Sequence, residues 1–118
     1  MNNDNDNDDK NLMEFIRKNP DGFTIGFNLK KPRYKNGFYV GLTNNINTDL
    51  TEAIKTLKHL RKMFKAVVYC GGWLDKKDNL FYLDLSKWIK DKSQAVKMAK
   101  TFKQLSVWDI AKQEAVYI

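Results

Sequence analysis

The fold is decided by the stretch Lys65-Ala-Val-Val-Tyr-Cys-Gly-Gly-Trp-Leu-Asp-Lys-Lys-Asp-Asn-Leu-Phe-Tyr-Leu-Asp-Leu85. Its first part, residues 65–70, is a continuous apolar run typical of a buried strand, which residues 71–74 extend or bend. The polar residues 75–79 predict a turn, and residues 80–85, rich in β-forming types, predict a returning strand. We therefore expect an antiparallel hairpin here.

Two further strands are predicted before this hairpin. Residues 23–29 alternate between apolar and polar types, and residues 37–43 are rich in β-forming types. The segment between them, residues 30–36, carries four positive charges and is too long for a two-residue turn. We expect residues 23–43 to form a second hairpin with a basic, proline-containing tip.

Helical periodicity appears in three places. An i, i+3, i+4 pattern after Asn11 indicates a short helix, which the turn residues 19–22 end. Asp49 has the position of an N-cap, and an apolar stripe follows it to about Phe64. Residues 91–102 predict another amphipathic helix with small and apolar residues facing inward.

Two short strands, residues 105–110 and 115–118, close the chain. The order is then ββ-α-ββ-α-ββ after a short N-terminal helix. Strand pairs joined by short turns imply an antiparallel sheet, and amphipathic helices need an apolar face to cover. We predict an α+β fold: an antiparallel sheet of about six strands with two main helices packed on one face. Residues 1–10, mostly Asn and Asp, are expected to be a disordered tail on a single domain, residues 11–118.

The charge of the 118-residue chain is unevenly distributed. The formal net charge is +7, but residues 1–10 hold four aspartates and one lysine, a net of −3. Residues 11–118 hold 20 basic and 10 acidic side chains, a net of +10. One cysteine and one histidine exclude a disulfide framework and a zinc cluster. With no secretory signal pattern and no apolar run of about 18 residues, we expect a cytoplasmic protein without a membrane segment.

Residues suited to catalysis are few. His59 lies among basic neighbours and is expected to be a surface residue, with a general base as the alternative. Cys70 ends an apolar strand and is expected to be a buried, inert thiol. Asp75, Asp78 and Asp84 are expected to belong to a charged hairpin turn, because the spacing of a calcium loop is absent. We predict no enzyme activity, no catalytic residue, no metal, no cofactor and no small-molecule substrate.

Two basic clusters contain no acidic residue and are the strongest functional signal. The candidate binding residues are Lys30, Lys31, Arg33, Tyr34 and Lys35 in the first cluster and Lys55, Lys58, Arg61, Lys62 and Lys65 in the second. A solvated helix face usually mixes signs, whereas concentrated like charges repel one another, so the clusters favour an anionic partner. Tyr34 adds an aromatic face that can stack on a base of single-stranded nucleic acid. Plain solvated faces are the alternative.

Other charged and aromatic residues receive structural interpretations. A third group of lysines, spread over residues 87–103 and broken only by Asp91, is interpreted as a solvated helix face. The large aromatic residues after the basic clusters are expected to be core, with an exposed indole that anchors an interface as the alternative. These residues are Trp73, Tyr82, Trp88 and Trp108.

Several stretches resemble a group of small proteins of phages and conjugative elements, most of which have no assigned function. The matching stretches are Asn19-Pro-Asp-Gly-Phe-Thr-Ile25, Gly37-Phe-Tyr-Val-Gly41, Gly71-Gly-Trp-Leu-Asp75 with Phe81-Tyr-Leu-Asp84, and Gln104-Leu-Ser-Val-Trp-Asp109. Within that group the chain is similar to anti-CRISPR proteins acting on type VI-B systems, whose effector is a guide-RNA-directed ribonuclease. The motifs are structural and carry no catalytic residue.

The resemblance implies a non-enzymatic inhibitor in a bacterial host cell, which binds an RNA-guided nuclease effector, its guide RNA or both. Many anti-CRISPR proteins are acidic and mimic nucleic acid, which a body with a net charge of +10 does not do. The alternative is a general single-stranded nucleic-acid-binding accessory protein of a mobile element. A small nuclease that uses His59 has the weakest support.

Overall fold

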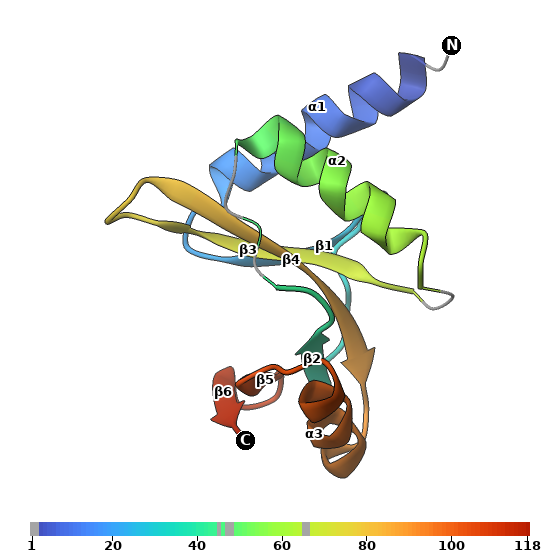
Figure 1. Ribbon diagram of the computed structural model, residues 1–118, viewed down its shortest axis with the longest axis vertical. Helices are drawn as coiled ribbons and strands as arrows, with labels where there is room; N and C mark the ends of the chain where they lie inside the picture. Colours follow the sequence, from blue (N-terminus) through green and yellow to red (C-terminus); the bar gives the residue numbers. More distant parts are fainter. Residues whose placement is uncertain (1–2, 45, 47–48, 65–66) are drawn as a thin grey trace.

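The computed structural model describes residues 3–44, 46, 49–64 and 67–118. These residues form the following elements (Figure 1): α1 (Asn3–Lys18), β1 (Phe23–Gly26), β2 (Phe38–Gly41), α2 (Leu50–Arg61), β3 (Tyr69–Asp75), β4 (Leu80–Ile89), α3 (Lys92–Thr101), β5 (Ser106–Asp109) and β6 (Glu114–Tyr117). The strands described make one antiparallel sheet in the order β1-β3-β4-β2-β5-β6. The predicted α+β class and antiparallel sheet are therefore confirmed.

The predicted hairpin of β3 and β4 is confirmed, and it lies inside the sheet, between β1 and β2. Its pairing runs from Tyr69 opposite Ser86 to Asp75 opposite Leu80. β4 continues to Ile89, beyond the predicted end of the strand, because its last four residues pair with β2.

The predicted hairpin over residues 23–43 is wrong. β1 pairs with β3, where Ile25 lies opposite Cys70, and β2 pairs with β4, where Val40 lies opposite Lys87. The central hairpin has two edges whose backbone groups need partners, and β1 and β2 each complete one of them. The basic segment between the two strands therefore passes from one side of the hairpin to the other instead of forming a hairpin tip.

The N-terminal helix is longer than predicted. α1 begins at Asn3, so residues 3–10 belong to a helix where a disordered tail was expected. Asp9 Oδ1 lies 2.8 Å from Lys58 Nζ of α2 and forms an ion pair with it. The helix continues into Leu12 and Ile16, both buried in the core, so packing against the rest of the protein stabilises it.

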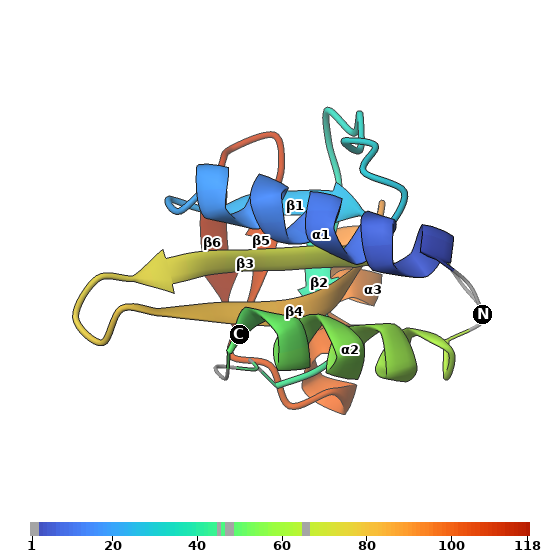
Figure 2. The same ribbon diagram turned by 90° about the horizontal axis from the view of Figure 1, so that it is seen from above.

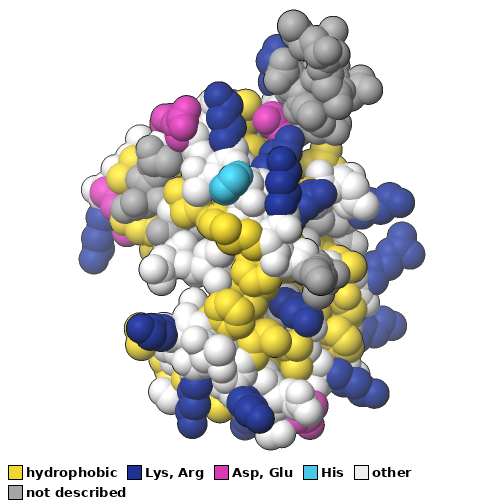
Figure 3. Space-filling view, turned by 45° about the vertical axis from the view of Figure 1, so that its right-hand side comes forward, with side chains coloured by type: hydrophobic (Ala, Val, Ile, Leu, Met, Phe, Trp, Pro, Cys, Tyr) yellow, Lys and Arg dark blue, Asp and Glu magenta, His cyan; other side chains and the backbone are white. Residues whose placement is uncertain are grey.

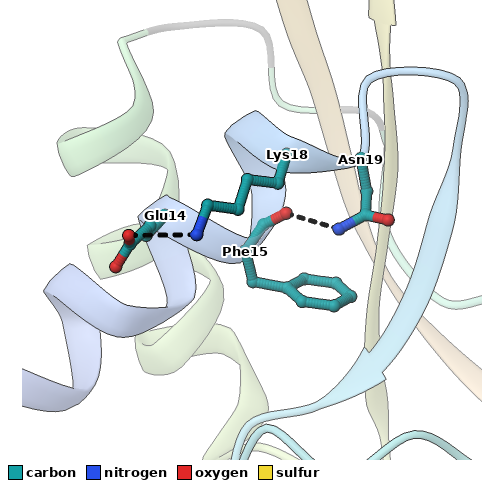
Figure 4. Close-up of polar contacts among 4 residues, drawn as sticks. All are labelled: Glu14, Phe15, Lys18 and Asn19. Atoms are coloured by element: carbon teal, nitrogen blue, oxygen red, sulfur yellow. Dashed lines mark hydrogen bonds and ion pairs between the residues drawn. The ribbon is translucent and has the colours of Figure 1, made fainter.

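The turn sequence after α1 ends the helix as predicted. Asn19 Nδ2 donates a hydrogen bond to the Phe15 carbonyl oxygen at 2.8 Å, and Lys18 pairs with Glu14 at 3.2 Å (Figure 4). The Phe15 ring contacts the Phe23 ring of β1 edge to face, with centroids 5.7 Å apart. The end of α1 is thereby packed against the first strand.

The helices described here cover one face of the sheet, as predicted. Leu83 and Leu85 of β4 pack in a core cluster with residues of α1 and α2, and Val40 of β2 packs with Ala95 of α3. Val40 lies opposite Lys87, which shares a face with Leu83 and Leu85 because side chains alternate along a strand. Figures 1 and 2 show α1 and α2 over the half of the sheet with β1, β3 and β4, and α3 at the other end.

Both later helices begin at a capping aspartate. Asp49 Oδ1 accepts a hydrogen bond from the Glu52 backbone N–H at 3.1 Å, which confirms the predicted N-cap of α2. Asp91 Oδ2 does the same for the Gln94 N–H of α3 at 3.0 Å. None of the helices in the described part of the chain is long and apolar enough to cross a membrane.

Candidate nucleic-acid interface

The face of the sheet opposite the helices carries aromatic and polar side chains. Because Leu83 and Leu85 point toward the helices, their neighbours on β4 point the other way. Cross-strand pairing adds residues of β2, β3 and β5 to the same face. The aromatic residues of this open face are Tyr39, Tyr69, Trp73, Tyr82, Trp88 and Trp108.

The prediction that the large aromatic residues form the core is therefore wrong. Trp73, Tyr82, Trp88 and Trp108 all lie on the open face, and the side chains of Trp73 and Trp108 are 44% and 41% exposed. Trp73 stacks on Tyr82 of the neighbouring strand, with centroids 5.1 Å apart and an angle of 15° between the rings. The largest fully buried side chains are aliphatic instead, and Leu83 and Leu85 are among them.

A groove with a volume of about 830 Å³ lies on the open face. Trp73 of β3 and Trp108 of β5 line it on either side of β4 and β2, and Asp84 of β4 lies between them in the strand order. Lys31 and Tyr34 of the basic segment also line it. Its size is within the range of about 300–1,000 Å³ that is common for ligand sites.

Tyr34 holds the basic segment against the open face. Its ring stacks on the Trp88 indole, with centroids 4.3 Å apart and planes within 5°, and its hydroxyl hydrogen-bonds to the Tyr69 hydroxyl at 2.8 Å. Trp88 Nε1 also donates to the Asn36 carbonyl oxygen at 2.8 Å. Burial, followed by the hydrogen bond to Tyr34, raises the pKa of Tyr69 to about 12, so its hydroxyl stays protonated. One face of the Tyr34 ring is thus covered by Trp88 rather than open to a base.

The segment that carries the first basic cluster lies at the rim of the groove, where Lys31, Pro32 and Tyr34 line it. Lys30, Lys31, Arg33 and Lys35 are all exposed, and Lys31 lines the groove itself. Because Tyr34 is held by Trp88 and Tyr69, the four cations flank a fixed point of the chain. The structure thus places Lys31 and Tyr34 of the first cluster at the groove, with Lys30, Arg33 and Lys35 as exposed neighbours in the sequence.

One residue of the second basic cluster, Arg61, lies near residues of the first cluster. Arg61 of α2 shares a second hollow, of about 400 Å³, with Lys30 and Lys31. Its guanidinium carbon lies 4.7 Å from the centre of the Phe27 ring, which holds the charge beside the hollow. Lys31 and Pro32 line both the hollow and the groove, so the two sites adjoin at these residues.

The remaining members of the second cluster are not placed at the groove. Lys55 and Lys62 are exposed on or next to α2, which packs on the opposite face of the sheet. Lys58 is paired with Asp9, so part of its charge is neutralised. Lys65 lies outside the described residues. Figure 3 shows basic side chains on both sides of a hydrophobic band on the face seen there, with acidic side chains toward the margins.

Asp84 lies on the floor of the groove, whereas the sequence placed it with Asp75 and Asp78 near the β3–β4 turn. Gly71 lies directly opposite it, and a Cβ atom built there would come within 2.8 Å of Asp84 Oδ1. A Cβ atom at Gly41 would lie 3.4 Å from Oδ2. Two glycines therefore make room for the carboxylate. Burial raises the pKa of Asp84 to about 6, and no other described residue gives it a hydrogen bond or an ion pair.

Two further polar groups lie on the floor. Ser86 is 6% exposed, and its Oγ has no hydrogen-bond partner among the described residues. Gln104 Nε2 donates to the carbonyl oxygens of Thr43 and Phe102, at 3.3 and 3.2 Å, which leaves Oε1 beside Gly41. The floor was not predicted from the sequence, although the alternation of Leu83 and Leu85 with polar residues was a signal for it.

The single histidine and the single cysteine lie away from the groove. His59 is exposed on α2 (cyan in Figure 3) and Cys70 is fully buried, both as predicted. Burial, with a smaller contribution from the nearby Asp84 charge, raises the pKa of the Cys70 thiol to about 12. In the part of the chain that the structure describes, no group of three or more His, Cys, Asp or Glu side chains is placed to hold a metal ion.

Comparison with known proteins finds no matching family model, no matching curated protein and no matching solved structure. The chemistry of the groove follows from its side chains: indole faces can stack on planar rings, cations can bind phosphates, and the floor can accept hydrogen bonds.

Proposed function

We propose that this chain is a non-enzymatic protein that binds single-stranded RNA along the open face of its sheet. The observation that supports this most is the exposed aromatic groove with a basic segment fixed on its rim. Base–aromatic stacking contributes about 1–3 kcal/mol per base, and lysine and arginine side chains bind the phosphates. A sheet that presents aromatic rings to unpaired bases is a common way for proteins to recognise RNA.

The proposed path of the strand passes from one hollow to the adjoining one. Arg61, Lys30 and Lys31 line the smaller hollow, and Lys31 also lines the aromatic groove. Phosphates running along the basic segment would place their bases over the sheet, where Trp73 and Trp108 are exposed. The strand is single rather than paired, because stacking on an indole needs an unpaired base face.

The second part of the proposal concerns the RNA and its context. In the cytoplasm of a bacterial host, the RNA is the guide of an RNA-guided nuclease, and the chain inhibits that nuclease by engaging the guide, the effector or both. The resemblance to anti-CRISPR proteins of type VI-B systems supports this step. A general single-stranded nucleic-acid-binding role is the second candidate, which the aromatic groove favours equally because stacking tolerates any base.

Salt-dependent binding tests the first part. We expect labelled single-stranded RNA of about ten nucleotides to bind with an affinity that falls steeply between about 50 and 200 mM salt. Replacing Lys30, Lys31, Arg33 and Lys35 with alanine should weaken binding and make the log–log salt slope shallower by up to about 3. A matched variant that replaces four exposed lysines in and before α3 should bind much more like the parent chain. These control lysines are Lys90, Lys92, Lys97 and Lys100.

Equal losses in the two four-site variants would mean that net charge alone drives binding, which would contradict the groove as the site. Replacing Trp73 and Trp108 with alanine separates the two contributions, because it should lower affinity at every salt concentration without changing the slope. No binding at low salt would remove the proposed function.

Effector activity tests the second part. We expect the chain to lower RNA cleavage by a type VI-B effector loaded with its guide, and the four-site variant in the basic segment to lose this inhibition. A pull-down from host lysate with and without ribonuclease separates the modes of inhibition. A partner retained after ribonuclease treatment is bound through the effector protein, whereas a partner released by it is bound through RNA. Unchanged RNA cleavage at saturating protein, together with intact RNA binding, would contradict the inhibitor proposal and favour the general nucleic-acid-binding role.

A further inference from the structure

The floor of the groove presents polar groups to which no described residue gives a hydrogen bond. The Asp84 carboxylate is placed between Gly71 and Gly41, and its two oxygens receive no hydrogen bond from another described residue. Gln104 Oε1 lies beside Gly41, because both amide hydrogens of that side chain point to backbone carbonyls. The Ser86 hydroxyl, two residues along β4 on the same face, is buried and without a partner in the described part of the chain.

Unsatisfied polar groups of this kind are rare inside folded proteins. A buried acceptor without a donor is costly, and native structures contain few of them outside functional sites. Among the described residues, only Ser86 Oγ is a fully buried group without a partner, whereas the side chains of Asp84 and Gln104 are half-buried. All three lie at one place, and a Cβ at Gly71 or Gly41 would crowd the Asp84 carboxylate or Gln104 Oε1. The arrangement is that of a site completed by donors from outside the chain.

The surroundings restrict which donor can enter. A cationic side chain would satisfy Asp84, but Lys31 lines the same groove and the neighbouring cations on the rim repel positive charge. A simple anion would suit the rim, but the Asp84 carboxylate repels it. A nucleotide fits both requirements, since its phosphate is anionic and its base is a planar ring with N–H donors. The indoles of Trp73 and Trp108 supply flat surfaces for such a ring.

Among the four RNA bases, guanine matches a carboxylate best. Its Watson–Crick edge presents two adjacent donors, N1–H and the N2 amino group, which can reach the two oxygens of one carboxylate together. Cytosine and adenine present an amino group beside a ring nitrogen that accepts, and uracil presents one N–H between two carbonyl oxygens. We infer that the floor of the groove is a guanine subsite, in which Asp84 accepts hydrogen bonds from N1–H and N2–H of an unpaired guanine. This inference rests on the proposed function, because it specifies a base within the bound RNA.

The charge state of Asp84 agrees with this role. Burial raises its pKa to about 6, which leaves the carboxylate mostly ionised at neutral pH, and no described cation forms an ion pair with it. An ionised carboxylate accepts hydrogen bonds at both oxygens, whereas a protonated one donates at one of them.

Base substitution in one RNA tests the subsite. The probes are uridine-rich RNAs of about ten nucleotides with a single central guanosine, inosine, adenosine, cytidine or uridine. We expect the guanosine RNA to bind about tenfold more tightly than the adenosine, cytidine and uridine RNAs. Inosine lacks the N2 amino group, so its RNA should bind with intermediate affinity.

The matched variants are Asp84→Asn, which keeps the shape of the side chain, and Glu114→Gln, which removes one exposed negative charge from β6. Asp84→Asn should abolish the preference for guanosine while the RNAs without guanosine still bind. Glu114→Gln should keep the preference.

The outcomes separate this inference from the proposed function. Equal binding of all five RNAs to the parent chain would overturn the subsite and leave the RNA-binding proposal standing. A guanosine preference that survives Asp84→Asn would also overturn it, because the base would then be read elsewhere. Failure of every RNA to bind would overturn both.

Discussion

Replacing Asp84 with asparagine tests the cost of keeping an ionised carboxylate on the groove floor. The pKa of Asp84 is raised by burial from 3.8 to about 6, so the folded chain binds this proton more tightly than the unfolded chain does. Stability from this group is therefore greatest below about pH 4, falls as the pH rises from about 4 to 6, and is constant above that range. Asparagine carries no charge and removes this pH-dependent loss.

The magnitude follows from the size of the shift. A difference of about 2 pKa units corresponds to about 3 kcal/mol at neutral pH, with 1.36 kcal/mol for each unit. This is an upper bound, because water reaches the open groove and the asparagine amide has its own cost of burial. We expect Asp84→Asn to be more stable than the parent chain by about 2 kcal/mol at pH of about 7.5.

Urea denaturation followed by tryptophan fluorescence measures the difference. At pH of about 4 the gap between the two proteins should close, because the aspartate is then largely protonated in the folded state. Glu114→Gln, an exposed substitution, should stay within about 0.5 kcal/mol of the parent at both pH values. Equal or lower stability of Asp84→Asn at pH of about 7.5 would refute the claim that the carboxylate is buried without compensation.

Three further predictions concern the support of the groove and the core. Tyr34→Phe removes the 2.8 Å hydrogen bond to Tyr69 but keeps the stacked ring, so urea denaturation should show a loss of about 1 kcal/mol. Gly37→Ala should cost about 2 kcal/mol or more in the same assay, because φ is +88° and the new Cβ would overlap the Trp88 indole; wild-type stability would contradict this conformation. Cys70 should not react with an aromatic disulfide reagent in the native state at pH of about 8 and should react fully in denaturant, because its thiol is buried with a pKa of about 12; fast native labelling would contradict its burial.

The local elements could be predicted because their signals are local. Capping by Asp49, the turn after α1 and the β3–β4 hairpin each depend on residues a few positions apart. The pairing of β1 and β2 depends on which strands offer a free edge, which neighbouring residues do not encode. Because β1 and β2 are close in sequence, they were expected to pair with each other, but β3 and β4 lie between them in the sheet.

The candidate site was predicted in part, for a similar reason. The acid-free run around Tyr34 was visible as a charge cluster in the sequence, and the structure places Lys31 and Tyr34 of that run at the groove. The aromatic side chains were assigned to the core by size and hydrophobicity. The helices cover only one face of the sheet, however, and Trp73 and Trp108 lie exposed on the other face. The position of Asp84 between Gly71 and Gly41 depends on cross-strand register, which only the folded sheet defines.

The strand order of the sheet also has a consequence for how the chain folds. β1 has β3 as its neighbour, and β2 lies between β4 and β5, so both early strands find partners far along the sequence. The β3–β4 hairpin and the β5–β6 pair close short loops, whereas the others must close long ones against chain entropy. During synthesis β1 and β2 emerge before β3 and β4, so they can pair only after the β3–β4 hairpin has been made. The rate-limiting step of folding should then be the docking of β1 and β2 onto the two edges of a hairpin that is already formed.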